Sequence, residues 1–171
     1  HDRNTMKKLL LIIALTLISN GITTMAQTLR PAGHVLTDDT CDILCKAAQN
    51  KSREMGLDIS FAIADADGLP RLFRRFGDTL VLSATLVPDK AYTSAITQTP
   101  TEDLIPLVAD GGNLMGMNTC DPRLTLVPGG GPLTVEGKIV GAIGVGGGSR
   151  EQDLEIADFI LSKFKEISIQ K

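Results

Sequence analysis

The residues most suggestive of chemistry form a glycine-rich segment ahead of the last predicted helix. Residues 141–149 read Gly-Ala-Ile-Gly-Val-Gly-Gly-Gly-Ser, and Gly146, Gly147 and Gly148 carry no side chains. Such backbone lets a ligand or a neighbouring segment approach closely. The amide groups at the following helix N-terminus attract a carboxylate or a phosphate. The same sequence also suits a tight turn without a ligand, so both interpretations stay open.

Dinucleotide binding does not fit this segment. The fingerprint Gly-x-Gly-x-x-Gly, taken from Gly144, requires glycine or alanine at the position that Ser149 occupies. Only 22 residues follow Ser149 (171 − 149), and they read as one helix, which leaves no room for a second strand and its acidic residue. The chain also lacks the Gly-Lys-Ser/Thr of a P-loop.

Reactive side chains are few. His34 is the one histidine beyond the first residue, which excludes zinc sites built from several histidines. Cys41, Cys45 or Cys120 could pair with His34 as a thiolate nucleophile, although nothing in the sequence orders such a pair.

Two carboxylates stand near a predicted turn. Asp65 and Asp67 could act as acid and base or hold a hard cation. However, Asp67 followed by Gly68 is also the ordinary sequence of a hairpin turn.

The N-terminus resembles a secretory signal. Met6 and two lysines precede a short apolar run, and Thr24 and Ala26 stand at −3 and −1 of a cut before Gln27. The apolar run is about ten residues, whereas a spanning helix needs ~20. We therefore predict an extension plus signal peptide over 1–26, one domain over 27–171, a periplasmic or secreted location, and no membrane attachment after cleavage.

Composition excludes some classes of function. The chain has 171 residues, 43% of them hydrophobic, a net charge of −3 and no tryptophan. These values indicate a single globular domain. They argue against nucleic-acid binding, which needs basic surface and aromatic stacking platforms.

Hydrophobic periodicity and turn residues predict an α+β fold with a mostly antiparallel five-stranded sheet. The predicted order is a helix over 37–55, a hairpin over 58–76, a helix over 82–97 that starts or kinks at Pro88, a short helix that opens within 99–102 and runs through Val108, a strand over 124–127, a hairpin over 133–145 around Glu136 and Gly137, and a last helix. Ser149 and Gln152 form a capping box for that last helix. Leu154, Ala157, Leu161 and Phe164 are its predicted buried stripe.

Four blocks stand in order along the chain. They are Ala-Ile-Ala-Asp-Ala-Asp-Gly at 62–68, Asp-Lys-Ala-Tyr-Thr-Ser-Ala at 89–95, Gly-Gly-Gly-Pro-Leu at 129–133, and the glycine-rich stretch at 137–148 followed by Gln152 and Asp153. Over about residues 35–166 the chain resembles the GlcG/HbpS-like family, which includes the C-terminal domain of PduO-type proteins. It departs from the family pattern at Gly146, where serine is usual, and at Pro88.

The resemblance implies a profilin-like α/β/α sandwich, homo-oligomers and, in several members, haem binding; secreted members are linked to haem and iron handling. Haem iron needs an axial ligand. His34 is our candidate, with Met115, Met117 and Tyr92 as alternatives. The haem propionates would meet the helix N-terminus after Gly148 or the strand that carries Arg71, Arg74 and Arg75.

We therefore predict an exported haem- or tetrapyrrole-binding protein. Its predicted cofactor-binding residues are His34, Asp65, Lys90, Gly146, Gly147 and Gly148, with His34 on the metal. The pocket would lie between the glycine-rich segment, the helix that carries Lys90 and a neighbouring chain. The alternatives are an accessory or structural homo-oligomer without a small ligand and a thiol-dependent enzyme; whether any reaction is catalysed stays open.

Overall fold

The computed structural model describes residues 36–169, and the signal-peptide prediction and His34 lie outside them. Within this part, helix α2 (Asp38–Glu54) is followed by strands β1 (Ser60–Asp65) and β2 (Pro70–Arg75). Helices α3 (Ser83–Thr97) and α4 (Thr101–Val108) and a short 3₁₀ turn η1 (Met117–Thr119) come next. Strands β3 (Gly130–Val135) and β4 (Lys138–Gly146) and helix α5 (Arg150–Ile169) complete the order.

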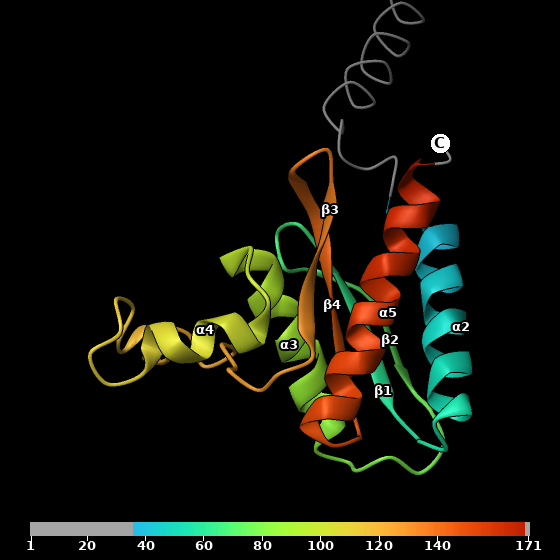
Figure 1. Cartoon of the computed structure of the whole chain (residues 1–171), viewed down its shortest axis with the longest axis horizontal. Coiled ribbons are helices and arrows are strands. Elements are labelled where there is room, and N and C mark those ends of the chain that lie inside the picture. Colours follow the sequence, from blue (N-terminus) through green and yellow to red (C-terminus); the bar gives the residue numbers. More distant parts are fainter. Residues whose placement is uncertain (1–35, 170–171) are drawn as a thin grey trace, which may run out of the picture. The chain divides into compact units, whose positions relative to one another are not determined.

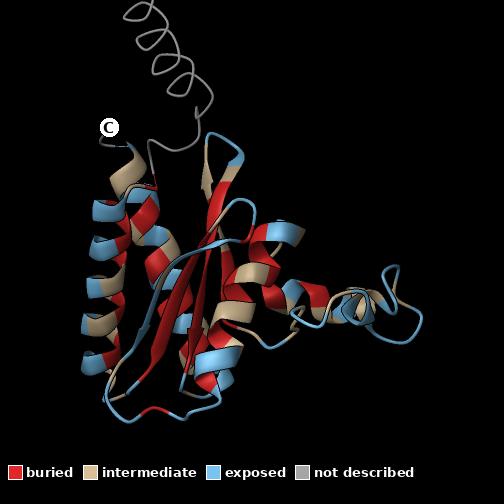
Figure 2. Ribbon diagram, turned by 180° about the vertical axis from the view of Figure 1, so that it is seen from behind, coloured by how far each residue is buried: buried red, intermediate tan, exposed pale blue. Residues whose placement is uncertain are grey.

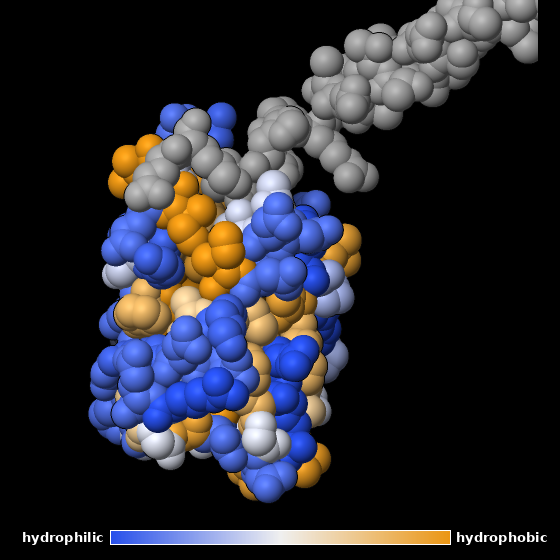
Figure 3. Space-filling view, turned by 90° about the vertical axis from the view of Figure 1, so that its right-hand side faces the viewer, coloured by the Kyte–Doolittle hydropathy of each residue, from blue (hydrophilic) through white to orange (hydrophobic). Residues whose placement is uncertain are grey.

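The four strands form one antiparallel sheet in the order β2-β1-β4-β3, which confirms the α+β class. Helices α2 and α5 pack on one face of the sheet and α3 on the other (Figure 1), so the chain forms an α/β/α sandwich. Buried residues concentrate on β1, β4 and part of β3 and on the helix faces turned toward them (Figure 2), whereas the edge strand β2 is mostly exposed. The outer face of α2 and α5 is mainly hydrophilic, with apolar side chains between (Figure 3).

The two faces of the sheet differ in side-chain size because successive residues of a strand point to opposite faces. On β1, Phe61 and Ile63 belong to the core beneath α2 and α5. Ala62 and Ala64 belong to a smaller cluster beneath α3. On β4, a Cβ atom at Gly144 would collide with the backbone of α3. Small residues therefore let α3 lie close to the sheet, which explains part of the glycine content.

The predicted fifth strand over 124–127 does not form in the described structure, whose sheet has four strands. The backbone amide of Thr125 donates instead to the side-chain oxygen of Thr93 on α3, and that of Leu124 to the carbonyl of Asp121. The segment thus runs along a helix rather than along a strand edge. Local alternation of apolar residues could not reveal this, because the partner is on α3.

Helix α3 spans nearly the residues predicted for it, 82–97. It starts at Ser83 and contains Pro88 in its interior, so the regular helix does not start at this proline. Its first turn is tied to the preceding loop, since the amides of Ser83 and Ala84 donate to the carbonyls of Leu80 and Val81. No helix of residues 36–169 has the length and apolar character that a membrane crossing requires.

Candidate functional site

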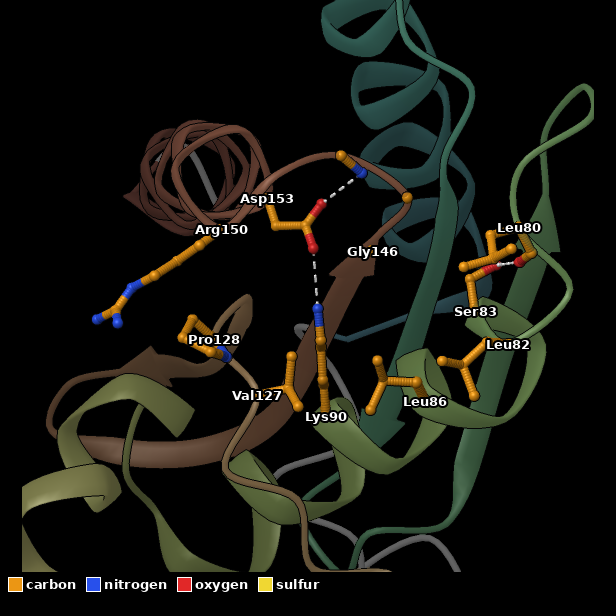
Figure 4. Close-up of a pocket in the computed structure, with 12 residues that line it drawn as sticks. Leu80, Leu82, Ser83, Leu86, Lys90, Val127, Pro128, Gly146, Arg150 and Asp153 are labelled. Carbon is orange, nitrogen blue, oxygen red and sulfur yellow. Dashed lines mark hydrogen bonds and ion pairs between the residues drawn. The ribbon is translucent and has the colours of Figure 1, made fainter.

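A cavity of about 220 Å³ lies at the end of β4. Its apolar lining comes from three stretches of chain: Leu80 and Leu82 before α3, Leu86 on α3, and Val127 and Pro128 before β3. Figure 4 shows Val127 and Pro128 on one side of Lys90 and Leu82 and Leu86 on the other. Leu80 and Leu82 are 68% and 62% exposed, so the cavity opens onto an apolar rim.

Lys90 and Asp153 form the polar base of the cavity. The Lys90 ammonium donates to Oδ2 of Asp153 at 3.0 Å and to the carbonyl of Val145 at 2.6 Å. The other carboxylate oxygen, Oδ1, accepts from the amide of Gly148 at 3.0 Å. Both side chains are buried. The charges are therefore compensated within the protein, and the ion pair shapes the site rather than offering a free charge to a ligand.

Burial acts on both groups of this pair. Removal from water lowers the pKa of Lys90, against the attraction of Asp153. It raises the pKa of Asp153, against the attraction of Lys90 and the hydrogen bond from Gly148. Desolvation penalises the charged form of any buried group.

The predicted glycines Gly146, Gly147 and Gly148 do line the cavity. However, the space of their missing side chains is largely filled by the protein's own atoms. A Cβ atom on Gly147 would lie 2.5 Å from Oγ1 of Thr79 and 2.6 Å from the carbonyl oxygen of Asp58. A Cβ atom on Gly146 would lie 2.6 Å from a methyl group of Val87. These glycines serve internal packing, and the cavity lies beside them.

The N-terminus of α5 also uses its own side chains. The predicted capping box forms, because the amide of Ser149 donates to Oε1 of Gln152 at 2.8 Å and the amide of Gln152 to Oγ of Ser149 at 3.4 Å. The amide of Gly148 is taken by Asp153. Arg150 lines the cavity as well, with its guanidinium extended away from the ion pair (Figure 4). It is thus the cationic group best placed for a ligand carboxylate.

Asp65 lies away from the other predicted site residues. It stands at the far end of β1, opposite Gly141, whereas Ser60 at the near end pairs with Gly146. Its carboxylate accepts the amides of Asp67 and Leu69 at 3.0 and 2.9 Å. Asp65 therefore caps the hairpin turn between β1 and β2, and it does not line the cavity.

The alternative ligand residues are also distributed elsewhere. Arg71 pairs with Asp38, and Arg75 donates to the carbonyl of Thr79. Tyr92 donates to Asp121. None of the cavity's lining residues is a histidine, methionine, cysteine or tyrosine. An axial ligand for haem iron would therefore have to reach the cavity from outside this lining.

The cysteines do not form an activated thiol site in residues 36–169. All three are free thiols, with Cys41 buried, Cys45 half-buried and Cys120 exposed. Burial raises the pKa of Cys41 and of Cys45, which disfavours the reactive thiolate. No group of three or more histidine, cysteine or acidic side chains in the described residues could hold a metal ion.

Sequence reasoning missed Asp153 as the partner of Lys90, and Val127 and Pro128 as one wall of the cavity. Asp153 stood in the block after the glycines, but no role was predicted for it. The one signal that could have identified Asp153 is that a buried lysine requires a nearby acidic partner.

Comparisons with known proteins point to a single protein family. A family model described as "Haem degrading protein HbpS-like" matches residues 36–161. The chain is 32% identical over 125 residues to an uncharacterized 15.0 kDa protein from the dhaT-dhaS intergenic region of Citrobacter freundii, covering 72% of this chain and 88% of the relative. It is 34% identical over 116 residues to the corrinoid adenosyltransferase PduO of Citrobacter freundii, covering 67% of this chain and 35% of that protein, about a third of its length.

The solved structures include a crystal structure of a PduOC:heme complex. It has a TM-score of 0.72 and 29% sequence identity with this chain, and the match covers 75% of this chain and 94% of that one.

Proposed function

We propose that this chain, which belongs to the HbpS-like family, binds haem or a related tetrapyrrole. The ligand would bind in the apolar cavity at the end of β4. The observation that carries the proposal is the similarity to the PduOC:heme complex, which spans three quarters of this chain. A flat, mostly apolar ligand with carboxylates suits a cavity with leucine and valine walls and an arginine at its edge.

The fit of haem to the cavity is partial. Drug-sized ligands usually occupy pockets of about 300–1,000 Å³, whereas this cavity measures about 220 Å³. The cavity can therefore receive one edge of the macrocycle and leave the rest on the apolar rim. Leu82 and Leu86 would contact the ring edge, and Arg150 would pair with a propionate. The bound iron would supply redox chemistry, and this chain's own residues would supply the apolar surface and the countercharge.

A second copy of the chain would complete the site. Leu80, Val81 and Leu82 are 68%, 74% and 62% exposed and form a continuous apolar rim. Burial of this rim against another copy would remove apolar area from water and enclose the rest of a macrocycle. His34, which lies outside the described residues, is our proposed axial ligand on either copy.

Hemin titration followed through the Soret band tests the binding proposal. Leu82→Lys places a charge in the cavity lining and should weaken binding at least about tenfold. Leu69→Lys is the matched control, because Leu69 is 59% exposed and lies in the β1–β2 turn, outside the cavity lining. Equal binding by both variants, or no Soret change with the wild-type protein, would reject the proposal; a Soret spectrum unaffected by His34→Ala would reject only the axial ligand.

Light scattering tests self-association. A mass of roughly 15 kDa for the 145-residue chain (145 of 171 residues, from 18.2 kDa) would indicate a monomer and contradict the second copy. Val81→Glu should shift an oligomer toward this mass, because it introduces a charge into the rim without altering a lining residue.

Export is a further part of the proposal. It is supported by the lysines, apolar run and small residues of the first 26 positions. Cell fractionation with intact-mass measurement tests it. We expect a periplasmic or secreted species that begins at Gln27, and a cytoplasmic species that retains residues 6–26 would contradict it.

An accessory oligomer without a small ligand is the second candidate function. It is favoured by the internal packing at Gly146 and Gly147 and by the satisfied amides at Gly148 and Ser149. In that case the protein would self-associate, and hemin would leave both its mass and its spectrum unchanged.

A further inference from the structure

One wall of the cavity belongs to a segment that has no place in the sheet. Residues 121–128 lie between η1 and β3, and Val127 and Pro128 at their end line the cavity. In the described structure, no backbone hydrogen bond joins residues 124–128 to a strand. The amide of Leu124 donates instead to the nearby carbonyl of Asp121. Something other than strand pairing must therefore hold this wall in place.

Thr93 on α3 supplies the first tie. Its hydroxyl accepts the amide of Thr125 at 3.0 Å and donates to the carbonyl of Arg123 at 3.4 Å. Thr125 in turn accepts the amide of Val127 on its own side-chain oxygen at 3.3 Å. The hydroxyl of Thr93, which is fully buried, thus holds the backbone that leads directly into the cavity wall.

Tyr92 supplies the second tie. Its hydroxyl donates to Oδ2 of Asp121 at 2.6 Å. The guanidinium of Arg123 lies over the Tyr92 ring at 3.5 Å from the centroid, and its Nε lies 3.7 Å from a carboxylate oxygen of Asp89. Asp121 also accepts the amide of Arg123 at 2.8 Å. Tyr92 and Thr93, which are neighbours on α3, therefore bind both the start and the middle of residues 121–128.

We propose that Tyr92 and Thr93 form a clasp that fixes residues 121–128 against α3, so that Val127 and Pro128 form a rigid wall of the cavity. Lys90 and Thr93 are three residues apart on α3 and therefore lie on one side of the helix. A single rigid helix thus sets both the base and this wall. Tyr92 and Thr93 are positioning residues, and their effect on a tetrapyrrole rests on the function proposed above.

The test compares Thr93→Val with Thr93→Ser. Valine removes both hydrogen bonds of the hydroxyl at similar volume, whereas serine retains the hydroxyl. Tyr92→Phe removes the bond to Asp121 and keeps the ring under Arg123. Thr97→Val is the matched control on the same helix, because the Thr97 hydroxyl donates to the carbonyl of Thr93 and makes no bond to residues 121–128 in the described structure.

Two readouts need no ligand. Amide hydrogen exchange at Leu124, Thr125 and Val127 should quicken about tenfold in Thr93→Val, while exchange in β1 and β4 stays at the wild-type rate. Trypsin should cleave after Arg123 several times faster in Thr93→Val and Tyr92→Phe. Thr93→Ser and Thr97→Val should match the wild-type protein in both measurements.

Hemin affinity is the third readout. It should fall about five- to tenfold in Thr93→Val and recover in Thr93→Ser. Unchanged exchange in Thr93→Val would overturn the clasp. Faster exchange with unchanged hemin affinity would overturn its positioning role. Wild-type protein that binds no hemin would instead reject the proposed function, and exchange and proteolysis would still decide whether the clasp holds the segment.

Discussion

Lys90 on α3 and Asp153 on α5 form an ion pair across the end of β4, with Nζ and Oδ2 3.0 Å apart. The exposed fractions of their side chains are 1% and 8%. The pair joins a helix on one face of the sheet to a helix on the other, beside the glycine-rich turn, whose Gly148 amide also donates to Asp153. Its charges are buried together, so each depends on the other for compensation.

Removal of one partner of this pair should be costly. Lys90→Met leaves an uncompensated buried carboxylate and should lower the free energy of unfolding by about 3–5 kcal/mol. The double variant Lys90→Met/Asp153→Leu should recover a large part of that loss, because apolar side chains can replace a buried pair. Urea unfolding measures both values.

The matched control is Lys51→Met. Lys51 pairs with Glu155 at 2.6 Å, but this pair is partly exposed, and exposed pairs contribute only about 0–1 kcal/mol. If Lys90→Met cost no more than Lys51→Met, the buried pair would not hold the two layers together.

Substitution of Gly147 should be much more harmful than substitution of Gly137. Both have positive φ, +134° and +76°. A Cβ atom at Gly147 would collide with Thr79 and Asp58, whereas one at Gly137 would meet nothing within 4 Å. We expect Gly137→Ala to cost about 1–2 kcal/mol from backbone strain alone and Gly147→Ala to cost clearly more. Thermal unfolding of the two variants checks this order, and equal losses would contradict the internal-packing role of Gly147.

Glu102 at the start of α4 should make stability depend on pH. Burial raises the pKa of this carboxyl above 4.5, and Asp103 and Asp158 add to the effect. Its Oε2 atom is buried, without a hydrogen-bond partner in the described structure. The folded state therefore holds the proton more tightly than the unfolded state, and stability falls as pH rises from about 4.5 through the raised folded pKa.

Glu102→Gln removes this loss. The variant should have a higher Tm than the wild-type protein at neutral pH, and the difference should disappear below about pH 4, where both states of the wild-type carboxyl are protonated. Differential scanning calorimetry at several pH values measures it. A wild-type advantage at neutral pH would show that the Glu102 charge is stabilised by its surroundings.

The three thiols should react with iodoacetamide in order of exposure. Cys120 is exposed and should be labelled first, Cys45 more slowly, and Cys41 only as the protein opens, because burial both covers it and raises its pKa. Peptide mass spectrometry over time gives the order, and all three should label together in denaturant. Fastest labelling of Cys41 or Cys45 at neutral pH would revive the thiol-enzyme alternative.

Much of the fold was predictable from local patterns. The helix predicted over 37–55 is α2, capped by Thr37, and the short helix predicted to run through Val108 is α4. Both hairpins form around their predicted turns, at Asp67 and Gly68 and at Glu136 and Gly137. The family resemblance stated from four sequence blocks is confirmed. These features depend on residues only a few positions apart, so a linear pattern contains them.

The phase of α5 was less predictable. Ala157 and Phe164 of the predicted stripe are buried, but Leu154 and Leu161 are only half-buried, and the other buried residues are Asp153, Ile156 and Ile160. Periodicity treats an acidic residue as exposed. Asp153 occupies a buried position because Lys90, 63 residues away in sequence, compensates its charge.

The sequence by itself determined the turns, caps, helix stripes and glycine-rich segment, because backbone preferences and hydrophobic periodicity act between near neighbours. Tertiary structure alone decided that Lys90 meets Asp153, that residues 124–127 follow α3 instead of joining the sheet, and that Asp65 caps a turn far from the cavity. The physical reason is that burial, charge compensation and hydrogen-bond partners at these positions come from distant parts of the chain. The wall and base of the cavity exist only once α3 is packed against the small side chains of β1 and β4.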